Sequence, residues 1–287
     1  MFSFEKKKDE DAYILTAVSG EPVHAQVAAV YEGLPVTAIG KYAFSGQRQL
    51  ESIELPKSVS YIGTHAFYNC RGLKEVHIHG HLTAVEDGAF KNCKKLHHIY
   101  MENMQHLDLL LNNISTEVTV HLHLAEAPDL ILLFPEYDFT YQEFVQPRLY
   151  DLIPFGSGSY FRMSAGVKSI NFTEYDKAFV YSKLHDQPAT SITLALYRLL
   201  TPYQLSDEAK TKYLDFLREH TKESCRLALD RADTSFIETL LKYGLLDEER
   251  ISDLIARASA EDKPEAVSIL MEHKLSIGGM RKRRFSL

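Results

Sequence analysis

The stretch YIGTHAFYNCRGLKEV, residues 61–76, has close counterparts immediately before and after it. AIGKYAFSGQRQLESI begins at residue 38 and AVEDGAFKNCKKLHHI begins at residue 84, so Phe44, Phe67 and Phe90 stand 23 residues apart. Further apolar columns keep the same step: Val36, Val59 and Leu82; Ile39, Ile62 and Val85; Leu50, Leu73 and Leu96; Ile53, Val76 and Ile99; Leu55, Ile78 and Met101. A register kept through three copies indicates an internal repeat.

A repeat of this length predicts a solenoid, in which one coil cannot bury its apolar side alone and stacks on its neighbours. The segments LESIEL (50–55), LKEVHI (73–78) and LHHIYM (96–101) alternate apolar and polar residues, as a strand with one buried face does. We expect these strands to pair in a parallel ladder, with the phenylalanines filling the interior between coils. Cys70 and Cys93 hold equivalent positions, which favours a buried column over a redox pair.

The segment VSYIGTHAFYNC (59–70), with YEGLPVTAIGKYAFSG (31–46) before it, resembles the repeat of the BspA-type leucine-rich repeat family. The resemblance covers about residues 13–101 and extends in degenerate form to about residue 124. It implies a binding or scaffolding module without catalysis. Many relatives are displayed on the cell surface, whereas the charged N-terminus MFSFEKKKDED of this chain lacks the apolar stretch of a secretory signal. We therefore expect a cytoplasmic protein.

The C-terminal part changes to a helical pattern. Ser206 is the expected N-cap of SDEAKTKYLDFLREH, and Asp207 and Glu208 suit the positive end of its dipole. Residues 233–274 resemble the paired helices of ankyrin-like repeats, but Leu240 and Leu270 are 30 residues apart, whereas the usual ankyrin period is about 33. The signature TPLH is also missing. A divergent helical-hairpin array, like that of cytoplasmic relatives in anaerobic bacteria, is the resulting prediction.

The predicted fold class is α+β: a short leucine-rich-repeat solenoid with parallel strands at a 23-residue period, followed by an all-α helical-hairpin array. We expect four regions. Residues 1–135 form the solenoid with its caps (11–35 and 104–135), residues 136–188 an irregular connector, residues 189–279 the helical array and residues 280–287 a basic tail. VTVHLHL (118–124) is expected to be a degenerate fourth strand.

The repeat register places polar side chains in columns on the outward strand face. One expected column contains Ser52, Glu75, His98 and His121, and the next contains Glu54, His77, Tyr100 and His123. Adjacent strands lie about 4.8 Å apart, so His98 and His121 are expected to be direct neighbours. The face can be an ordinary solvated or protein-contact surface, a pH-sensitive patch or a metal site formed by imidazole and carboxylate.

Composition narrows the function. A net charge of −7 argues against a general nucleic-acid binder, and no apolar run reaches the length of a membrane span. The sequence contains none of the common nucleophile, zinc or phosphate-loop motifs, and the glycines of FGSGSYFR (155–162) lack P-loop spacing. We therefore predict no enzyme, no cofactor and no resident metal.

The predicted function is recognition of a protein or peptide partner through the repeat surface. The expected partner-binding residues are Glu54, Glu75, His77, His98, Tyr100, His121 and His123. The alternative is a metal-binding sensor or metal-dependent hydrolase that uses the histidine-rich strand face.

Overall fold

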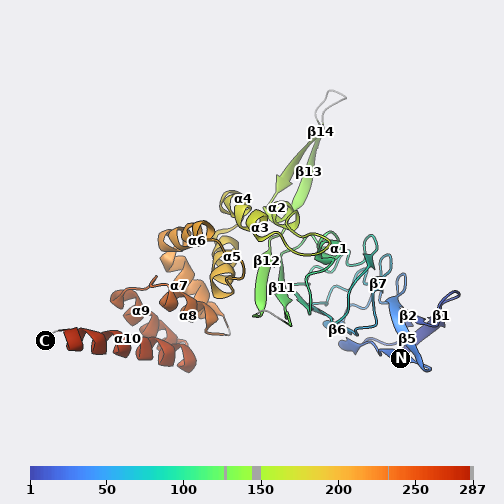
Figure 1. The fold of residues 1–287 in the computed structure, drawn as a ribbon, viewed down its shortest axis with the longest axis horizontal. Coiled ribbons are helices and arrows are strands. Elements are labelled where there is room, and N and C mark those ends of the chain that lie inside the picture. The colour runs from blue at the N-terminus through green and yellow to red at the C-terminus, as the bar shows by residue number, and fades with distance from the viewer. Residues whose placement is uncertain (126–127, 144–149, 232, 285–287) are drawn as a thin grey trace. The chain divides into compact units, whose positions relative to one another are not determined.

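The computed structural model describes residues 1–125, 128–143, 150–231 and 233–284, and the chain divides into two compact units, Met1–Asp186 and Gln187–Leu287 (Figure 1). The first unit contains the repeats and the second is helical. The fold class is therefore the predicted one, a solenoid of parallel strands at a period of about 23 residues followed by helices.

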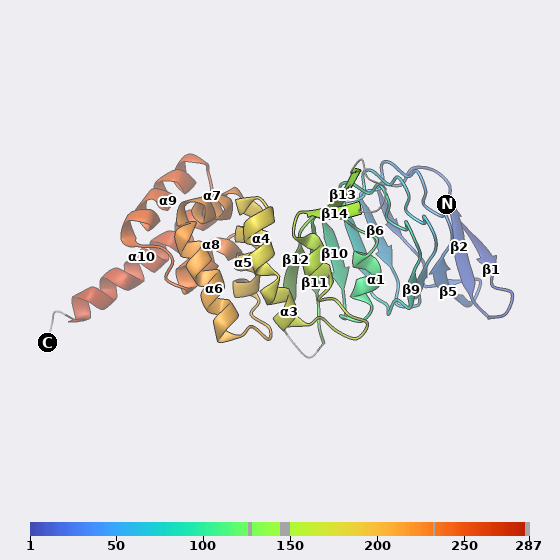
Figure 2. The same cartoon turned by 90° about the horizontal axis from the view of Figure 1, so that it is seen from above.

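Two sheets run along the repeat unit, one on each side of the regular coils (Figure 2). The larger strands form one sheet in the order β12-β11-β10-β8-β6-β3. Their bounds are β3 His24–Gln26, β6 Ser52–Leu55, β8 Glu75–Ile78, β10 His98–Met101, β11 Val118–Leu122 and β12 Leu130–Phe134. All neighbours in this sheet are parallel except β11 and β12, so β12 reverses the direction of the sheet at its C-terminal end.

The second sheet has the order β1-β2-β5-β7-β9, with β4 also paired to β5. Its strands are β1 Phe2–Lys6, β2 Tyr13–Val18, β4 Val30–Tyr31, β5 Leu34–Ile39, β7 Tyr61–Ile62 and β9 Ala84–Val85. Strand β2 pairs in parallel with β5 and antiparallel with β1, so the N-terminal segment covers the first coil.

The predicted phenylalanine column fills the space between the coils. The ring centroids of Phe44 and Phe67 are 5.0 Å apart, and those of Phe67 and Phe90 are 5.1 Å apart. Both Cys70 and Cys93 are buried in the same interior, and each thiol donates to a carbonyl of the preceding coil. The hydrogen bond with Cys70, together with burial, raises the pKa of the Cys93 thiol far above its ordinary value, so this column is structural.

Two tight bends in every coil require left-handed backbone. The φ angles are positive in two columns of residues, which are Tyr42, His65 and Gly88 and then Gly46, Asn69 and Asn92. Glycine and asparagine enter this region most easily, which explains the second column. Asn92 also donates to Asn69 Oδ1 at 3.0 Å, so these bends are tied to each other along the solenoid.

In the described part of the chain, four short helices lie at the C-terminal end of the repeat unit. Helices α1 Leu107–Leu111, α2 Gly158–Arg162, α3 Phe172–Lys177 and α4 Phe179–His185 belong to this end. The guanidinium of Arg162 is buried and donates to the backbone carbonyls of Leu111, Ile114, Thr116, Pro135 and Gly158. One side chain thus joins α1, the chain before β11 and the chain after β12.

The expected irregular connector, residues 136–188, contains regular structure in its described part. Strands β13 Asp138–Glu143 and β14 Tyr150–Phe155 form an antiparallel pair, and α2 to α4 follow. The prolines suggested breaks, but a two-stranded sheet leaves each strand with a free edge, where the missing amide of Pro154 is tolerated. Gly156 has a φ of 77° and begins the turn after β14, so the glycines here shape a bend.

The second unit contains α5 Pro188–Leu200, α6 Asp207–Glu219, α7 Thr221–Asp230, α8 Ser235–Lys242, α9 Glu248–Ala260 and α10 Pro264–Arg284. Ser206 caps α6 as predicted, because its hydroxyl accepts from Ala209 N at 3.2 Å. Of the expected basic tail, residues 280–284 lie within α10, and residues 285–287 fall outside the described part. Across the described helices, none is long and apolar enough to cross a bilayer.

Candidate functional site

The outward positions of the larger sheet form a polar face. Two columns of paired residues cross the strands. One column contains His24, Ser52, Glu75, His98 and Thr119. The next contains Gln26, Glu54, His77, Tyr100, His121 and Ile131. The first three coils have the predicted register. The fourth does not, because His121 stands beside Tyr100 and the direct neighbour of His98 is Thr119.

The shift has a local cause. Ile99 pairs with Val120, a step of 21 residues instead of 23, because α1 and its flanking turns replace the loop of a regular coil. A change of two residues keeps the inward and outward faces but moves each outward side chain of the fourth strand from its predicted column into the neighbouring one. His123 therefore leaves the column of Tyr100 and lies one position beyond the paired Met101 and Leu122.

Three rings stack along the second column. The rings of His77 and Tyr100 are 4.4 Å apart at an interplanar angle of 5°, and those of Tyr100 and His121 are 4.5 Å apart at 12°. All three are half-buried. The stack gives the face a preorganised aromatic ridge, because each ring restricts the rotamer of its neighbour.

His98 joins this ridge diagonally. Its Nδ1 lies 3.1 Å from Nε2 of His121, so the predicted proximity is present despite the different register. A hydrogen bond between two imidazole nitrogens needs one donor and one acceptor, so at least one of the two rings must be neutral in this arrangement.

Carboxylates border the ridge on β6, on β8 and just after β10. Glu75 lies 3.5 Å from Nε2 of His77, and His79 lies between Glu54 (3.1 Å) and Glu102 (2.8 Å). Lys57 also reaches Glu102 at 3.0 Å. The hydrogen bonds from His79 and then Lys57 lower the pKa of the Glu102 carboxyl, so it is ionised at neutral pH.

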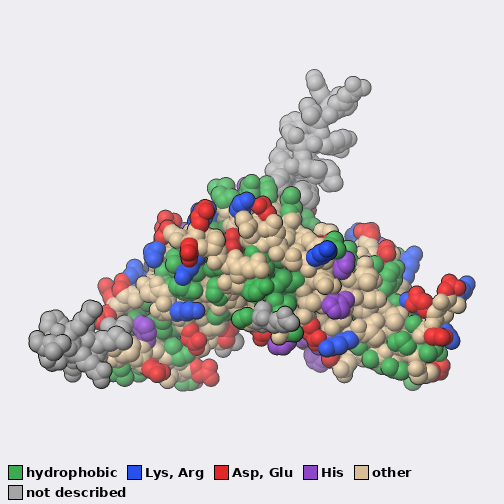
Figure 3. Space-filling model, in the orientation of Figure 1, with side chains coloured by type: hydrophobic (Ala, Val, Ile, Leu, Met, Phe, Trp, Pro, Cys, Tyr) green, Lys and Arg blue, Asp and Glu red, His purple; other side chains and the backbone are tan. Residues whose placement is uncertain are grey.

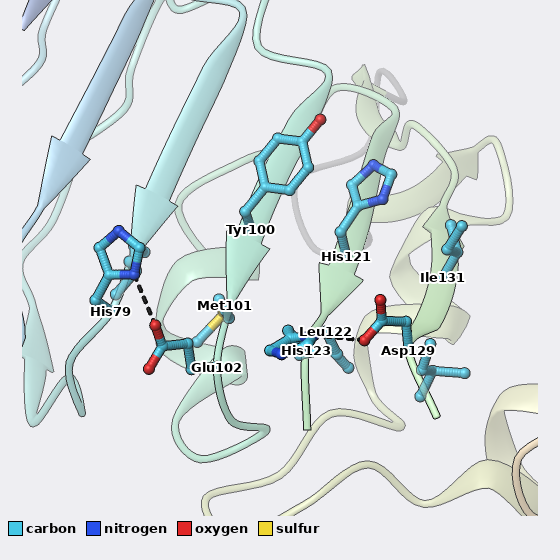
Figure 4. A pocket seen from close by; sticks show the side chains of 11 residues that line it. His79, Tyr100, Met101, Glu102, His121, Leu122, His123, Asp129 and Ile131 are labelled. Carbon is cyan, nitrogen blue, oxygen red and sulfur yellow. Dashed lines mark hydrogen bonds and ion pairs between the residues drawn. The ribbon is translucent and has the colours of Figure 1, made fainter. Parts of the chain in front are cut away.

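A hollow of about 390 Å³ opens where β8, β10, β11 and β12 end (Figure 4). Its floor is apolar, with Met101 and Leu122 contributed by neighbouring strands. Figure 4 shows the rings of Tyr100 and His121 extending side by side from these strands. On one flank His79 contacts Glu102, and on the other His123 Nδ1 lies 2.6 Å from Asp129 Oδ1.

We name this surface the histidine face and define it by ten residues: Glu54, Glu75, His77, His79, His98, Tyr100, Glu102, His121, His123 and Asp129. Histidine side chains also emerge at several places on the repeat unit in the view of Figure 3. The seven residues proposed from the sequence are among these ten, and their role in partner binding stays a prediction. His79, Glu102 and Asp129 were missed, although His79 and Glu102 are separated by the repeat step of 23 residues and could have been found from it.

The arrangement does not favour a metal site. Among the described residues, no group of three or more His, Cys, Asp or Glu side chains can hold a metal ion. The imidazole and carboxylate groups are instead engaged with one another in hydrogen bonds. Ionic, hydrogen-bonding and aromatic contacts with another molecule are the chemistry that this face offers.

The repeats match the model of the BspA type leucine rich repeat region in 6 copies, over residues 33–118. No curated protein matches the chain significantly.

Solved structures of leucine-rich repeat proteins are among the matches. A T. pallidum leucine-rich repeat protein is 28% identical with a TM-score of 0.28, over 35% of this chain and 50% of that one. A leucine-rich cell surface protein from Faecalibacterium prausnitzii is 26% identical with a TM-score of 0.31, over 37% of this chain and 33% of that one. A leucine-rich repeat protein from Bacteroides capillosus is 23% identical with a TM-score of 0.30, over 43% and 93%.

The chain thus spans half the length of the T. pallidum protein and about a third of the F. prausnitzii protein. The family match rests on the repeated columns described above. Residues 33–118 of this chain are a BspA-type leucine-rich repeat region.

Proposed function

We propose that this protein is a non-catalytic interaction module and that the histidine face binds a protein or peptide partner. The observation that carries the proposal is the stacked ridge of His77, Tyr100 and His121 beside a hollow with an apolar floor. A rigid aromatic group next to a concave apolar surface is a common anchor of protein interfaces, because little side-chain entropy is lost on binding.

The fold supports this proposal. A solenoid offers an extended surface whose inward positions hold the structure, so the outward positions can differ in every coil. The outward column of Glu54, His77, Tyr100 and His121 changes chemistry at each step, whereas the inward column beside it stays apolar. A surface of this kind suits one specific partner.

The free, buried state of Cys70, Cys93 and Cys225 accords with a reducing compartment. A cytoplasmic location and the absence of nucleic acid among the partners stay predictions.

The test is a comparative capture experiment. The intact protein, Tyr100→Ala and Tyr42→Ala are immobilised in parallel and exposed to lysate of the native cell. Tyr42 is the matched control because it is an exposed tyrosine, at 48%, on a bend away from the larger sheet. A partner that wild type and Tyr42→Ala retain and Tyr100→Ala loses supports the proposal. A partner that all three retain equally contradicts it.

A further inference from the structure

The charge of the histidine face identifies the kind of partner. Glu54, Glu75, Glu102 and Asp129 carry four negative charges, and Lys57 at the rim contacts Glu102, so these groups sum to −3 before any histidine is counted. The Lys74–Glu51 ion pair, at 2.9 Å, adds no net charge at the start of the strands. At neutral pH the face therefore complements a positively charged segment.

The hollow has the shape for a long basic side chain. Its apolar floor suits the methylene stem of Lys or Arg, and Glu102 and Asp129 on its two flanks suit the cationic end. Both carboxylates are held by a histidine, Glu102 by His79 and Asp129 by His123, so their positions are set before a partner arrives.

The same histidines make the charge depend on pH. Histidine is the side chain whose charge most readily changes near physiological pH, whereas ionised carboxylates and lysine keep their charge between about pH 5.5 and 7.5. The five rings of the face are His77, His79, His98, His121 and His123. Each ring that gains a proton adds one positive charge to the face, while the acceptor ring of the His98–His121 hydrogen bond stays neutral as long as that contact persists.

The groups around these rings come from every strand of the face. Strand β6 and the loop after it supply Glu54 and Lys57, β8 supplies Glu75, β10 and its end supply Tyr100 and Glu102, and Asp129 precedes β12. His97 and Glu117 stand just before β10 and β11. A proton on His79 or His123 strengthens the contact of that ring with its carboxylate. The positive charge of the ring then offsets the negative charge that would attract a cationic partner.

We propose, as a refinement that rests on the function proposed above, that the partner presents a Lys- or Arg-rich segment to the histidine face at neutral pH and dissociates on acidification. Because charge complementarity selects the partner, we expect the affinity to fall also as ionic strength rises.

The experiment uses the intact protein and a library of random dodecapeptides displayed on phage, selected at pH 7.5 and eluted at pH 5.5. Recovered peptides are synthesised and their dissociation constants are measured for the wild type and four variants. Glu102→Gln with Asp129→Asn removes the flanking charges with little change of shape. Glu219→Gln with Glu223→Gln is the matched control, because both side chains are exposed on the helical unit. Tyr100→Ala tests the proposed function itself.

We expect the recovered peptides to be rich in Lys and Arg, to bind about 10-fold more weakly at pH 5.5, and to lose about 10-fold in affinity with the flank variant but not with the control. In His98→Asn with His121→Gln, amide groups replace the interacting nitrogens. This variant lacks both rings of the pair, one of which stays neutral in the wild type, so it loses at most one protonation step and should show a smaller pH effect.

Peptides that lack basic residues, an empty selection, or equal losses in the flank and control variants would each overturn the refinement. If the recovered peptides lack basic residues but their binding still depends on Tyr100, the proposed function stands and only the chemistry of the partner is wrong. If binding is independent of Tyr100 as well, both proposals fail.

Discussion

The two faces of the larger sheet differ in how far their residue chemistry repeats from one coil to the next. Inward positions repeat one chemistry through four coils, as Ile53, Val76, Ile99 and Val120 show, and all of these are buried. Outward positions one residue further along carry an acid, an imidazole, a phenol and a second imidazole. The inward face must fill the same space in every layer, whereas the outward face meets only solvent or a partner. Stability and recognition are thus separated by a single step along each strand.

The largest effect is expected inside. Phe67→Ala removes the middle ring of the phenylalanine stack and leaves a cavity between two coils, which should lower the free energy of unfolding by about 3–5 kcal/mol. Thermal unfolding of the full chain, followed with hydrogen exchange of the repeat unit, measures this loss. A change below about 1 kcal/mol would contradict the view that each coil depends on its neighbours.

A second large effect is expected at the C-terminal end of the repeats. Arg162→Met leaves five backbone carbonyls without their shared donor, and we expect a loss of about 2–4 kcal/mol. Burial lowers the pKa of Arg162 to about 10, so the guanidinium is still charged at pH 7 and donates to all of its acceptors. Hydrogen exchange should rise first in β11 and β12. Unchanged protection there would show that Arg162 is not the link between these segments.

An intermediate effect is expected at the bends, where two glycines allow a matched comparison. Gly88 has a φ of 65°, and a Cβ there would lie 2.8 Å from Nε2 of His65, so Gly88→Ala should cost about 1–2 kcal/mol. Gly46 also has positive φ, but it has open space and stands in the column of Asn69 and Asn92. Gly46→Asn should therefore change stability by about 0.5 kcal/mol or less. Equal losses in urea unfolding would refute the column assignment.

Tyr100→Ala should reduce partner affinity strongly and stability only slightly, whereas Phe67→Ala should mainly reduce stability. Tyr100 is half-buried and stacked between two histidines, so its loss should cost about 1 kcal/mol or less in stability. Its effect on partner affinity should be about 10-fold or more. Thermal unfolding and binding are measured on the same preparation. A stability loss as large as that of Phe67→Ala would place this ring in the core and not on the recognition face.

The smallest effect concerns the pH dependence of stability. His79 and Lys57 lower the pKa of Glu102 in the folded state, so the contribution of this carboxyl is present above its ordinary pKa of 4.5 and is lost as pH falls through the lower folded value. A carboxyl titration by NMR should give a pKa below 4.5 for Glu102, and Lys57→Met should raise it. An unshifted pKa in the wild type would show that these contacts do not persist in solution.

Much of the repeat unit was predictable from sequence because the packing requirement recurs. Leu50, Leu73 and Leu96 fill the same site in successive layers, so one correct alignment predicts the inward and outward columns of the first three coils. The helix start at Ser206 was predictable for a local reason, since the cap and its acceptor are three residues apart. Arg162 was not, because its carbonyl partners lie up to 51 residues away in sequence.

The sequence by itself determined the coils, their layer spacing and seven of the ten side chains of the histidine face, because a repeated apolar step forces one side of each strand inward. Only the tertiary structure decided which of those side chains touch. The last strand joins the sheet after a step of 21 residues, and backbone pairing with β10, not the repeat, places His121 beside Tyr100. That placement creates the three-ring ridge, and it brings His123 to Asp129 at the edge of the hollow.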